Sequence, residues 1–283
     1  HLCYKEGLRP DGNCRACMVE IKGERVLAPS CCRGPAKDME VSSVSPRAVH
    51  SQKMVLELLE SDAPEADLKP GMNELRHWSG KLGVGKPRFE ARAQPAPDVS
   101  HPAMSVNLDA CIQCTRCVRA CREEQVNDVI GYSWRGSHAR ITFDFDDPMG
   151  ESTCVACGEC VQACPTGALA PAKGAYAVKA DKVVESVCPF CGVGCRLSYH
   201  VKDNAIVRVE GAGGPANRDR LCVKGRFGFD YAHHPHRLTK PLVRKPGAPK
   251  HADFTVDPTR WSEVFREPTW EEALELAAGG LRK

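Results

Sequence analysis

The chain has 283 residues and a net charge of +3; 17 residues are cysteines, and hydrophobic residues make up 42%. This length excludes a single small disulfide-rich domain, and the near balance of acidic and basic residues along the chain argues against binding to nucleic acid or a membrane surface. The hydrophobic fraction is below the ~45–50% of ordinary globular domains, so something besides a hydrophobic core must stabilise the fold.

The cysteines occur in three dense groups: five in residues 1–32, eight in residues 111–164 and four in residues 188–222. An odd total leaves one thiol unpaired in any disulfide scheme, and cysteines two or three positions apart are poorly placed to pair with each other. The grouping therefore favours ligation of metal ions or clusters. No apolar stretch approaches the ~18 residues of a spanning helix.

The first group has the spacing C-x10-C-x2-C-x13-C if its ligands are Cys3, Cys14, Cys17 and Cys31. Three thiolates on one loop with a distant fourth are how plant-type ferredoxins hold a [2Fe-2S] cluster. Residues 18–22, Gly23-Glu24 and residues 25–27 predict a hairpin that returns Cys31 to the loop. Cys32 is an alternative to Cys31. A structural zinc site is the alternative to the cluster, because these thiols would also satisfy tetrahedral zinc.

The segment after the first group is predicted to be a helical connector. Within residues 46–61, Met54, Val55, Leu58 and Leu59 recur at helical spacing, which predicts packing rather than cofactor contact. Residues 33–110 contain no cysteine, so His77 has no thiol partner and is predicted to be an ordinary histidine on a helix face.

The second group contains two matching runs. Residues 111–121 read C-I-Q-C-T-R-C-V-R-A-C, and residues 154–165 read C-V-A-C-G-E-C-V-Q-A-C-P. Both have the C-x2-C-x2-C-x3-C spacing of bacterial two-cluster ferredoxins, in which the fourth cysteine of one run ligates the other cluster. This crossing predicts one [4Fe-4S] cluster on Cys111, Cys114, Cys117 and Cys164, and a second on Cys154, Cys157, Cys160 and Cys121. Between the runs, alternating Ile141, Phe143 and Phe145 predict an added hairpin strand.

A further [4Fe-4S] site is predicted from C-x2-C-x3-C-x26-C, at Cys188, Cys191, Cys195 and Cys222. Taken alone, this spacing also suits zinc. Leu197, Tyr199 and Val201 alternate, Asp203-Asn204 supplies a turn, and residues 206–209 return, which predicts a small β unit around the site. The four sets together use 16 of the 17 cysteines.

These motifs, in this order, resemble the α subunit of molybdenum- or tungsten-dependent, NAD-linked formate dehydrogenases. The resemblance covers most of residues 1–240 and is especially specific in the stretch L-C-V-K-G-R-F-G-F-D-Y that begins at Leu221. It implies formate oxidation, or CO2 reduction, at a metal held by bis-molybdopterin guanine dinucleotide, with electrons passing through the clusters. In that family the lysine matching Lys224 lies between the last cluster and a pterin, so the resemblance implies that Lys224 helps electron transfer.

The resemblance also implies partners. FMN and NAD are expected on partner subunits: a flavin- and NAD-binding β subunit and, as a further candidate, a small [2Fe-2S] γ subunit. Nucleic-acid and membrane partners are not expected, and cluster ligation without disulfides agrees with a cytoplasmic location. Related complex I subunits carry a His-Cys3 cluster between the first and second sets, which residues 33–110 do not support. The formate-binding residues are expected beyond Lys283, and the opening strands of the first domain before His1.

The predicted fold class is α+β in several iron–sulfur domains. We expect a partial plant-type [2Fe-2S] ferredoxin (β-grasp) domain, a helical connector, a two-cluster [4Fe-4S] ferredoxin domain, the cluster-bearing start of a molybdopterin oxidoreductase domain, and the beginning of its α/β region. Their respective boundaries are 1–45, 46–100, 101–180, 181–240 and 241–283. Residues 241–257 are predicted to be a connecting loop, and Thr269 with Glu272 is predicted to begin a helix.

Two other functions compete with the relay of a formate dehydrogenase. The first is an electron-transfer subunit of a complex I-like or hydrogenase-associated assembly without formate chemistry. The motif C-P-F-C-G-V-G-C and Lys224 argue against this function, because a subunit that only transfers electrons needs no residues next to a pterin. The second is a zinc-stabilised interaction protein. His233, His234 and His236 are predicted to be surface or domain-contact residues rather than ligands.

Overall fold

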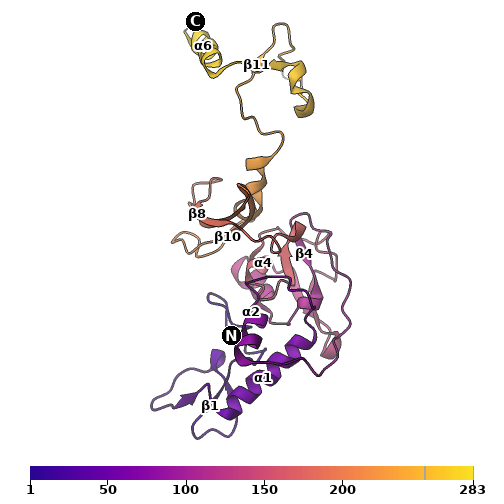
Figure 1. Ribbon diagram of the computed structural model, residues 1–283, viewed down its shortest axis with the longest axis vertical. Helices are drawn as coiled ribbons and strands as arrows, with labels where there is room; N and C mark the ends of the chain where they lie inside the picture. The colour runs from indigo at the N-terminus through magenta and orange to yellow at the C-terminus, as the bar shows by residue number, and fades with distance from the viewer. Residues whose placement is uncertain (252, 283) are drawn as a thin grey trace. The chain divides into compact units, whose positions relative to one another are not determined.

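The structure is a computed structural model that describes residues 1–251 and 253–282. The chain divides into two compact units, His1–Phe229 and Asp230–Lys283. Short strands and helices occur in both (Figure 1), so the predicted α+β class is confirmed. Within the described residues, no helix combines the length and apolar character that a membrane crossing requires.

The first unit begins with a small antiparallel sheet and two helices. The strands lie in the order β2-β1-β3, with β1 at Met18–Ile21, β2 at Ala28–Pro29 and β3 at Val41–Ser42. The helices that follow are α1 (Pro46–Ser61) and α2 (Glu74–Leu82).

The predicted hairpin after Cys17 is confirmed, but its returning strand begins later than expected. β1 pairs with β2 so that Val19 lies opposite Ala28, whereas residues 25–27 belong to the connection. Gly23 has a φ of 84° in this connection, a backbone conformation that glycine adopts without steric cost. The hairpin brings the segment after β2 back beside Cys17.

Helix α1 coincides with the predicted helix, and Leu59 of the predicted packing residues contacts the apolar cluster, but other residues form the buried face. The buried residues are Ala48, Gln52, Leu56 and Glu60, whereas Leu58 of the predicted set is 50% exposed. The sequence pattern missed this face because two of its four residues are polar. Gln52 Nε2 donates to the Met18 carbonyl over 2.7 Å, so it can be buried without losing its hydrogen bond. Leu56 packs in one cluster with Leu75 of α2.

The middle of the first unit holds both cysteine runs and the largest apolar cluster. Its elements are β4 (Met104–Val106), α3 (Arg116–Arg119), a π-helical turn (Ala120–Glu124), β5 (Ile130–Ser133), β6 (Arg140–Phe143), α4 (Glu159–Ala163) and β7 (Leu169–Pro171). β4 and β7 pair antiparallel and close the segment on itself. β5 and β6 form the predicted extra hairpin, although Phe145 lies beyond it and is 98% exposed.

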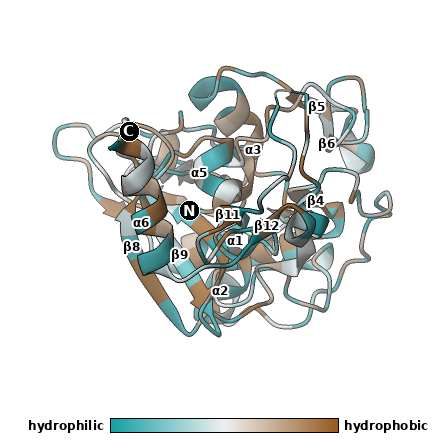
Figure 2. Cartoon of the chain, turned by 90° about the horizontal axis from the view of Figure 1, so that it is seen from above, coloured by the Kyte–Doolittle hydropathy of each residue, from teal (hydrophilic) through white to brown (hydrophobic). Residues whose placement is uncertain are grey.

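The last part of the first unit is a three-stranded sheet in the order β10-β9-β8, followed by a short helix. The elements are β8 (Lys182–Val187), β9 (Arg196–Lys202), β10 (Ala205–Gly211) and α5 (Val223–Phe227). Asp203 and Asn204 both have positive φ and join β9 to β10, as the predicted turn requires. β8 was not predicted, and its apolar residues are visible at the edge of the sheet (Figure 2).

The second unit contains β11 (Val243–Arg244), β12 (Phe265–Arg266) and α6 (Trp270–Leu281). β11 lies inside the segment predicted to be a connecting loop and pairs with β12 beyond it, so the prediction of residues 241–257 as loop missed one strand. The predicted start of α6 is confirmed, because Thr269 Oγ1 accepts a hydrogen bond from the Glu272 amide over 3.2 Å.

Gly158→Ala is expected to destabilise the first unit more than Gly136→Ala. Both glycines have positive φ, 73° and 61°, so each alanine is disfavoured by roughly 1–2 kcal/mol. Only at Gly158 would the new Cβ overlap neighbours, namely Arg226 and Phe227, which adds about 1–3 kcal/mol. Urea unfolding of both variants measures the difference, and equal losses of stability would contradict the close packing.

Candidate iron–sulfur sites

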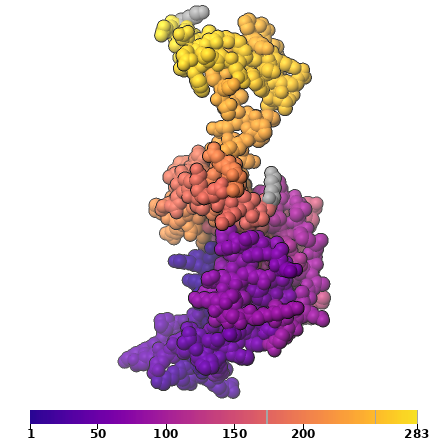
Figure 3. All heavy atoms as spheres, in the orientation of Figure 1, coloured from indigo at the N-terminus to yellow at the C-terminus, as the bar shows by residue number. Residues whose placement is uncertain are grey.

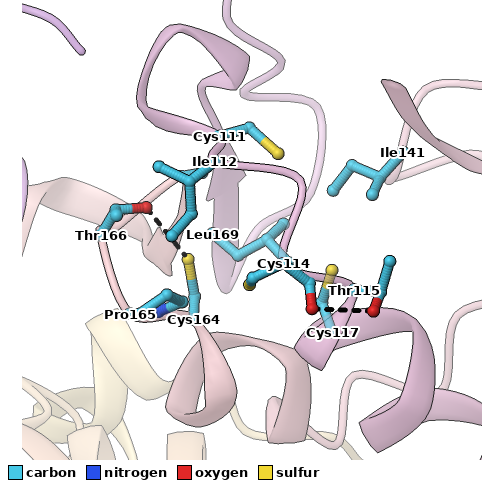
Figure 4. A pocket seen from close by; sticks show the side chains of 11 residues that line it. Cys111, Ile112, Cys114, Thr115, Cys117, Ile141, Cys164, Pro165, Thr166 and Leu169 are labelled. Atoms are coloured by element: carbon cyan, nitrogen blue, oxygen red, sulfur yellow. Dashed lines mark hydrogen bonds between the residues drawn. The ribbon is translucent and has the colours of Figure 1, made fainter. Parts of the chain in front are cut away.

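One pocket of the first unit is lined by four thiols, those of Cys111, Cys114, Cys117 and Cys164 (Figure 4). Three come from the first run and the fourth ends the second run, so the residues predicted to share a cluster lie together. The rest of the lining is mostly apolar and includes Ile112, Ile141 and Leu169. An all-sulfur donor set in apolar surroundings is typical of iron–sulfur ligation.

The other crossed set is also close in space. Burial is the main cause that raises the pKa of Cys160, and the neighbouring Cys157, Cys154 and Cys121 raise it further. Burial also raises the pKa of Cys157, and the neighbouring Cys154 and Cys121 raise it further. Cys121 therefore lies with the three cysteines of the second run, as the crossed pattern predicts.

The thiol pKa values fit these sites to a cluster. Burial raises the pKa of Cys111 to about 11 and that of Cys114 to about 12, so both thiols are neutral at pH 7 without a bound cation. Iron ions supply positive charge and ligate the thiolate form, so cluster binding would replace the thiol protons.

The first predicted set is brought together at the N-terminus of the unit. A hydrogen bond with the Cys14 side chain is the main cause that lowers the pKa of Cys3 to about 5. The sulfurs of Cys17 and Cys31 are 3.4 Å apart, and the charge of Cys3 also acts on Cys31. Cys32 Sγ lies 3.7 Å from Cys31 Sγ, but Cys32 is exposed, whereas Cys31 packs with Cys3 and Cys14. This packing favours Cys31 as the fourth ligand.

Three cysteines of the fourth predicted set lie in the loop that connects β8 to β9, and the fourth, Cys222, directly precedes α5. The Cys188 amide donates to the Cys195 carbonyl over 2.8 Å, and Cys188, Cys191 and Cys222 all act electrostatically on Cys195. Burial is the main reason that the pKa of Cys195 is raised. Lys224 follows Cys222 within α5, and its side chain is exposed.

A buried arginine joins the third set to the fourth. Arg226 of α5 donates from Nε to the Cys157 carbonyl over 2.9 Å and forms an ion pair with Glu159 of α4. Both side chains are 3% exposed, and Glu159 also accepts from the Leu221 amide over 3.0 Å. In the space-filling view residues 181–229 lie directly against the middle of the unit (Figure 3). Arg226 therefore connects the loop of the third set, at Cys157, to the helix that follows the last cysteine of the fourth set, Cys222.

Two arginines of α3 join the first set to the second. Arg116 donates to the His1 and Tyr4 carbonyls over 3.0 and 2.8 Å and forms a two-point ion pair with Glu74. Arg119 donates to carbonyls of the same N-terminal segment and is 1% exposed on its side chain. The N-terminal segment is therefore held against the first run by guanidinium groups.

A buried lysine contacts the end of the second run. Lys69 Nζ donates to the Cys164 carbonyl over 2.7 Å and lies 5.1 Å from the centroid of the Tyr176 ring. Burial lowers the pKa of Lys69. No structural or functional role was predicted from the sequence for Lys69, Arg116, Arg119 or Arg226. The available signal was that basic residues alternate with cysteines in C-T-R-C-V-R-A-C and follow Cys222 in C-V-K-G-R.

The histidines lie where they were predicted. His77 is on the exposed side of α2, with its ring centroid 5.4 Å from that of Trp78. His233, His234 and His236 are exposed, and the rings of His234 and His236 meet edge to face.

Two family models match the chain in the regions just described. Residues 110–168 match the 4Fe-4S dicluster domain, and residues 181–234 match the molybdopterin oxidoreductase Fe4S4 domain. The chain is therefore an iron–sulfur, electron-transfer segment related to molybdopterin oxidoreductases. The predictions of a [4Fe-4S] dicluster domain and a molybdopterin oxidoreductase [4Fe-4S] domain are confirmed at this level, whereas the [2Fe-2S] domain and the individual ligands stay predictions.

Curated relatives align with nearly all of the chain. A protein of Staphylococcus haemolyticus (strain JCSC1435) named "Putative formate dehydrogenase" is 29% identical over 327 residues, covering 100% of this chain and 31% of the relative. A subunit of the NADH-quinone oxidoreductase of Rhizobium meliloti (strain 1021) is 33% identical over 292 residues, covering 99% of this chain and 33% of the relative. The chain thus spans about a third of the length of these relatives.

A solved structure supports the fold. A chain of the NAD+-reducing [NiFe]-hydrogenase in the H2-reduced state superposes with a TM-score of 0.56 at 26% identity. The match covers 61% of this chain and 75% of the hydrogenase chain.

Glu159→Gln is expected to destabilise the first unit by about 3–5 kcal/mol, because it leaves the buried Arg226 guanidinium without its carboxylate. Glu185→Gln is the matched control. Its ion pair with Arg196 is more than half exposed on both sides, so the loss should stay below about 1 kcal/mol. Chemical denaturation of both holoproteins measures the difference, and similar stabilities would show that the buried pair does not hold the two segments together.

Proposed function

We propose that this chain is the electron-relay part of the α subunit of an NAD-dependent formate dehydrogenase that uses molybdenum or tungsten. The relay carries electrons from formate oxidation to a flavin- and NAD-binding subunit, or in reverse towards CO2 reduction. The observation that carries the proposal is the succession of four all-cysteine sets, the last of which lies in a molybdopterin oxidoreductase Fe4S4 domain. Relatives named as formate dehydrogenases align over the whole chain and support this choice.

In this proposal each set has a defined ligand group. The [2Fe-2S] cluster uses Cys3, Cys14, Cys17 and Cys31, and the three [4Fe-4S] clusters use Cys111, Cys114, Cys117 and Cys164; Cys154, Cys157, Cys160 and Cys121; and Cys188, Cys191, Cys195 and Cys222. The clusters supply one-electron redox chemistry when bound. The chain's own part is to supply the thiolates, to bury those of the middle two sets wholly or in part, and to hold the sets in sequence.

The proposal also covers the two ends of the relay, where electrons enter and leave the clusters. Lys224, two positions after Cys222, is proposed to help electrons pass between the last cluster and a pterin. The bis-molybdopterin guanine dinucleotide, the FMN and the NAD are proposed to bind mostly elsewhere in the α subunit or on β and γ partners. A cytoplasmic location is proposed with them.

A second candidate function is electron transfer in a complex I-like or hydrogenase-associated assembly. It is favoured by the structural likeness to the NAD+-reducing hydrogenase and by the alignment with the NADH-quinone oxidoreductase relative. Anaerobic mixing of the complete complex with formate separates the two candidates. Bleaching of the cluster absorbance by formate supports the first, whereas bleaching by NADH but not by formate supports the second.

Anaerobically purified protein is expected to contain about 14 iron atoms and an equal amount of acid-labile sulfide per chain, because one [2Fe-2S] and three [4Fe-4S] clusters require them. Metal analysis and a sulfide assay measure both quantities. A colourless protein with about one zinc per cysteine set and little sulfide would contradict the relay and favour the zinc alternative.

Cys121→Ser is expected to damage the cluster of the second run, although Cys121 belongs to the first. Its EPR signal should match that of Cys157→Ser and differ from that of Cys114→Ser, which alters the other pocket. Cys32→Ser is the control and should retain all clusters. If Cys121→Ser loses only the EPR signal that Cys114→Ser also loses, the crossed ligation is wrong.

A further inference from the structure

Arg119 lies at the contact between the first and second ligand sets. Its Nη2 atom donates to the Cys3 carbonyl over 2.6 Å and to the Cys114 carbonyl over 3.0 Å. One nitrogen thus bridges the backbones of two predicted ligands that belong to different clusters. Its Nη1 atom donates to the Arg9 carbonyl over 2.6 Å, which holds the N-terminal loop on the same guanidinium.

The positive charge of Arg119 is only partly balanced by the carboxylate that pairs with it. The Asp11 carboxylate is 3.9 Å from Nε, and its side chain is 29% exposed. Within the described residues, Nε itself has no hydrogen-bond partner. Arg116, on the same helix, differs because Glu74 pairs with two of its nitrogens over 2.6 and 2.7 Å. A buried charge without a close partner is costly, so a further negative group beside Arg119 would be stabilising.

Clusters held by four thiolates are negatively charged, and they would be the missing negative groups. Cys3 lies in the first set and Cys114 in the second, and both belong to one apolar cluster of side chains. In such weakly screened surroundings a guanidinium acts over several ångströms.

We propose that Arg119 is a positioning residue for electron transfer between the [2Fe-2S] cluster and the adjacent [4Fe-4S] cluster. This inference rests on the proposed function. Arg119 holds the two ligand loops together by bridging the Cys3 and Cys114 carbonyls. Its charge also favours the reduced state of each cluster, because an added electron increases the negative charge beside it. In the transfer one cluster loses one electron and the other gains it, with no bond made and no proton moved.

Redox titration followed by EPR tests the proposal in the complete protein. Arg119→Gln should lower the equilibrium constant for one-electron reduction about tenfold at one or both of the two clusters, which corresponds to about 59 mV. Arg119→Lys keeps the charge and should restore the potentials to within about threefold of the unaltered protein. The Lys variant should still exchange electrons more slowly between the two clusters, because one ammonium replaces the two-point bridge.

Two further variants separate charge from folding. Arg88→Gln combined with Glu57→Gln removes a neutral ion pair but leaves the hydrogen bonds to the Cys3 and Cys114 carbonyls in place, and the potentials should stay unchanged. Asp11→Asn removes the carboxylate near Arg119 at a partly exposed position, and should raise the same equilibrium constants about threefold.

The outcomes distinguish this inference from the proposed function. Absence of iron and sulfide in the unaltered protein would reject the proposed function. If the clusters are present but their potentials do not move in Arg119→Gln, the inference fails. If Arg119→Gln does not assemble its clusters, Asp11→Asn decides, and unchanged potentials in that variant overturn the inference.

Discussion

The meeting of thiols from two separate runs is the constraint on which the first unit depends. Cys164 shares a pocket with Cys111 and Cys114, and Cys121 lies with the cysteines of the second run. The pairing of β4, which precedes the first run, with β7, which follows the second, brings the two ends of the segment together so that the runs can meet. The helices of this segment are only four or five residues long, so the crossing and the apolar core around it hold the segment together more than regular structure does.

Buried basic side chains are the second feature that holds the ligand sets in place. Arg119, Arg226 and Lys69 each donate to the backbone carbonyl of a predicted ligand, at Cys3 and Cys114, at Cys157 and at Cys164 respectively. A cation so placed holds a ligand loop and offers a counter-charge to thiolates. The contacts of Arg119 and Arg226 lie between ligand sets, where the proposed relay needs short and rigid spacing.

The comparisons and the site agree on an iron–sulfur segment and differ in the assembly it would serve. The dicluster and Fe4S4 domains cover the second, third and fourth sets, while the first set lies outside both matches. Relatives with formate dehydrogenase and quinone oxidoreductase names align almost equally well. The shared chemistry is transfer of single electrons, and the electron donor is what separates the proposed functions.

The sequence alone determined the cysteine grouping, the meeting of cysteines from the two runs, α1, the β9-β10 hairpin and the start of α6. These features depend on spacing within a short stretch, such as C-x2-C runs, Asp203-Asn204 or Thr269 before its helix, so local chemistry reveals them. Only the tertiary structure decided that Gln52 and Leu56 form the buried face of α1, and that Arg119 and Arg226 bridge ligand sets. Those contacts join residues far apart in the chain, and a buried polar side chain can be recognised only when its distant hydrogen-bond partner is in place.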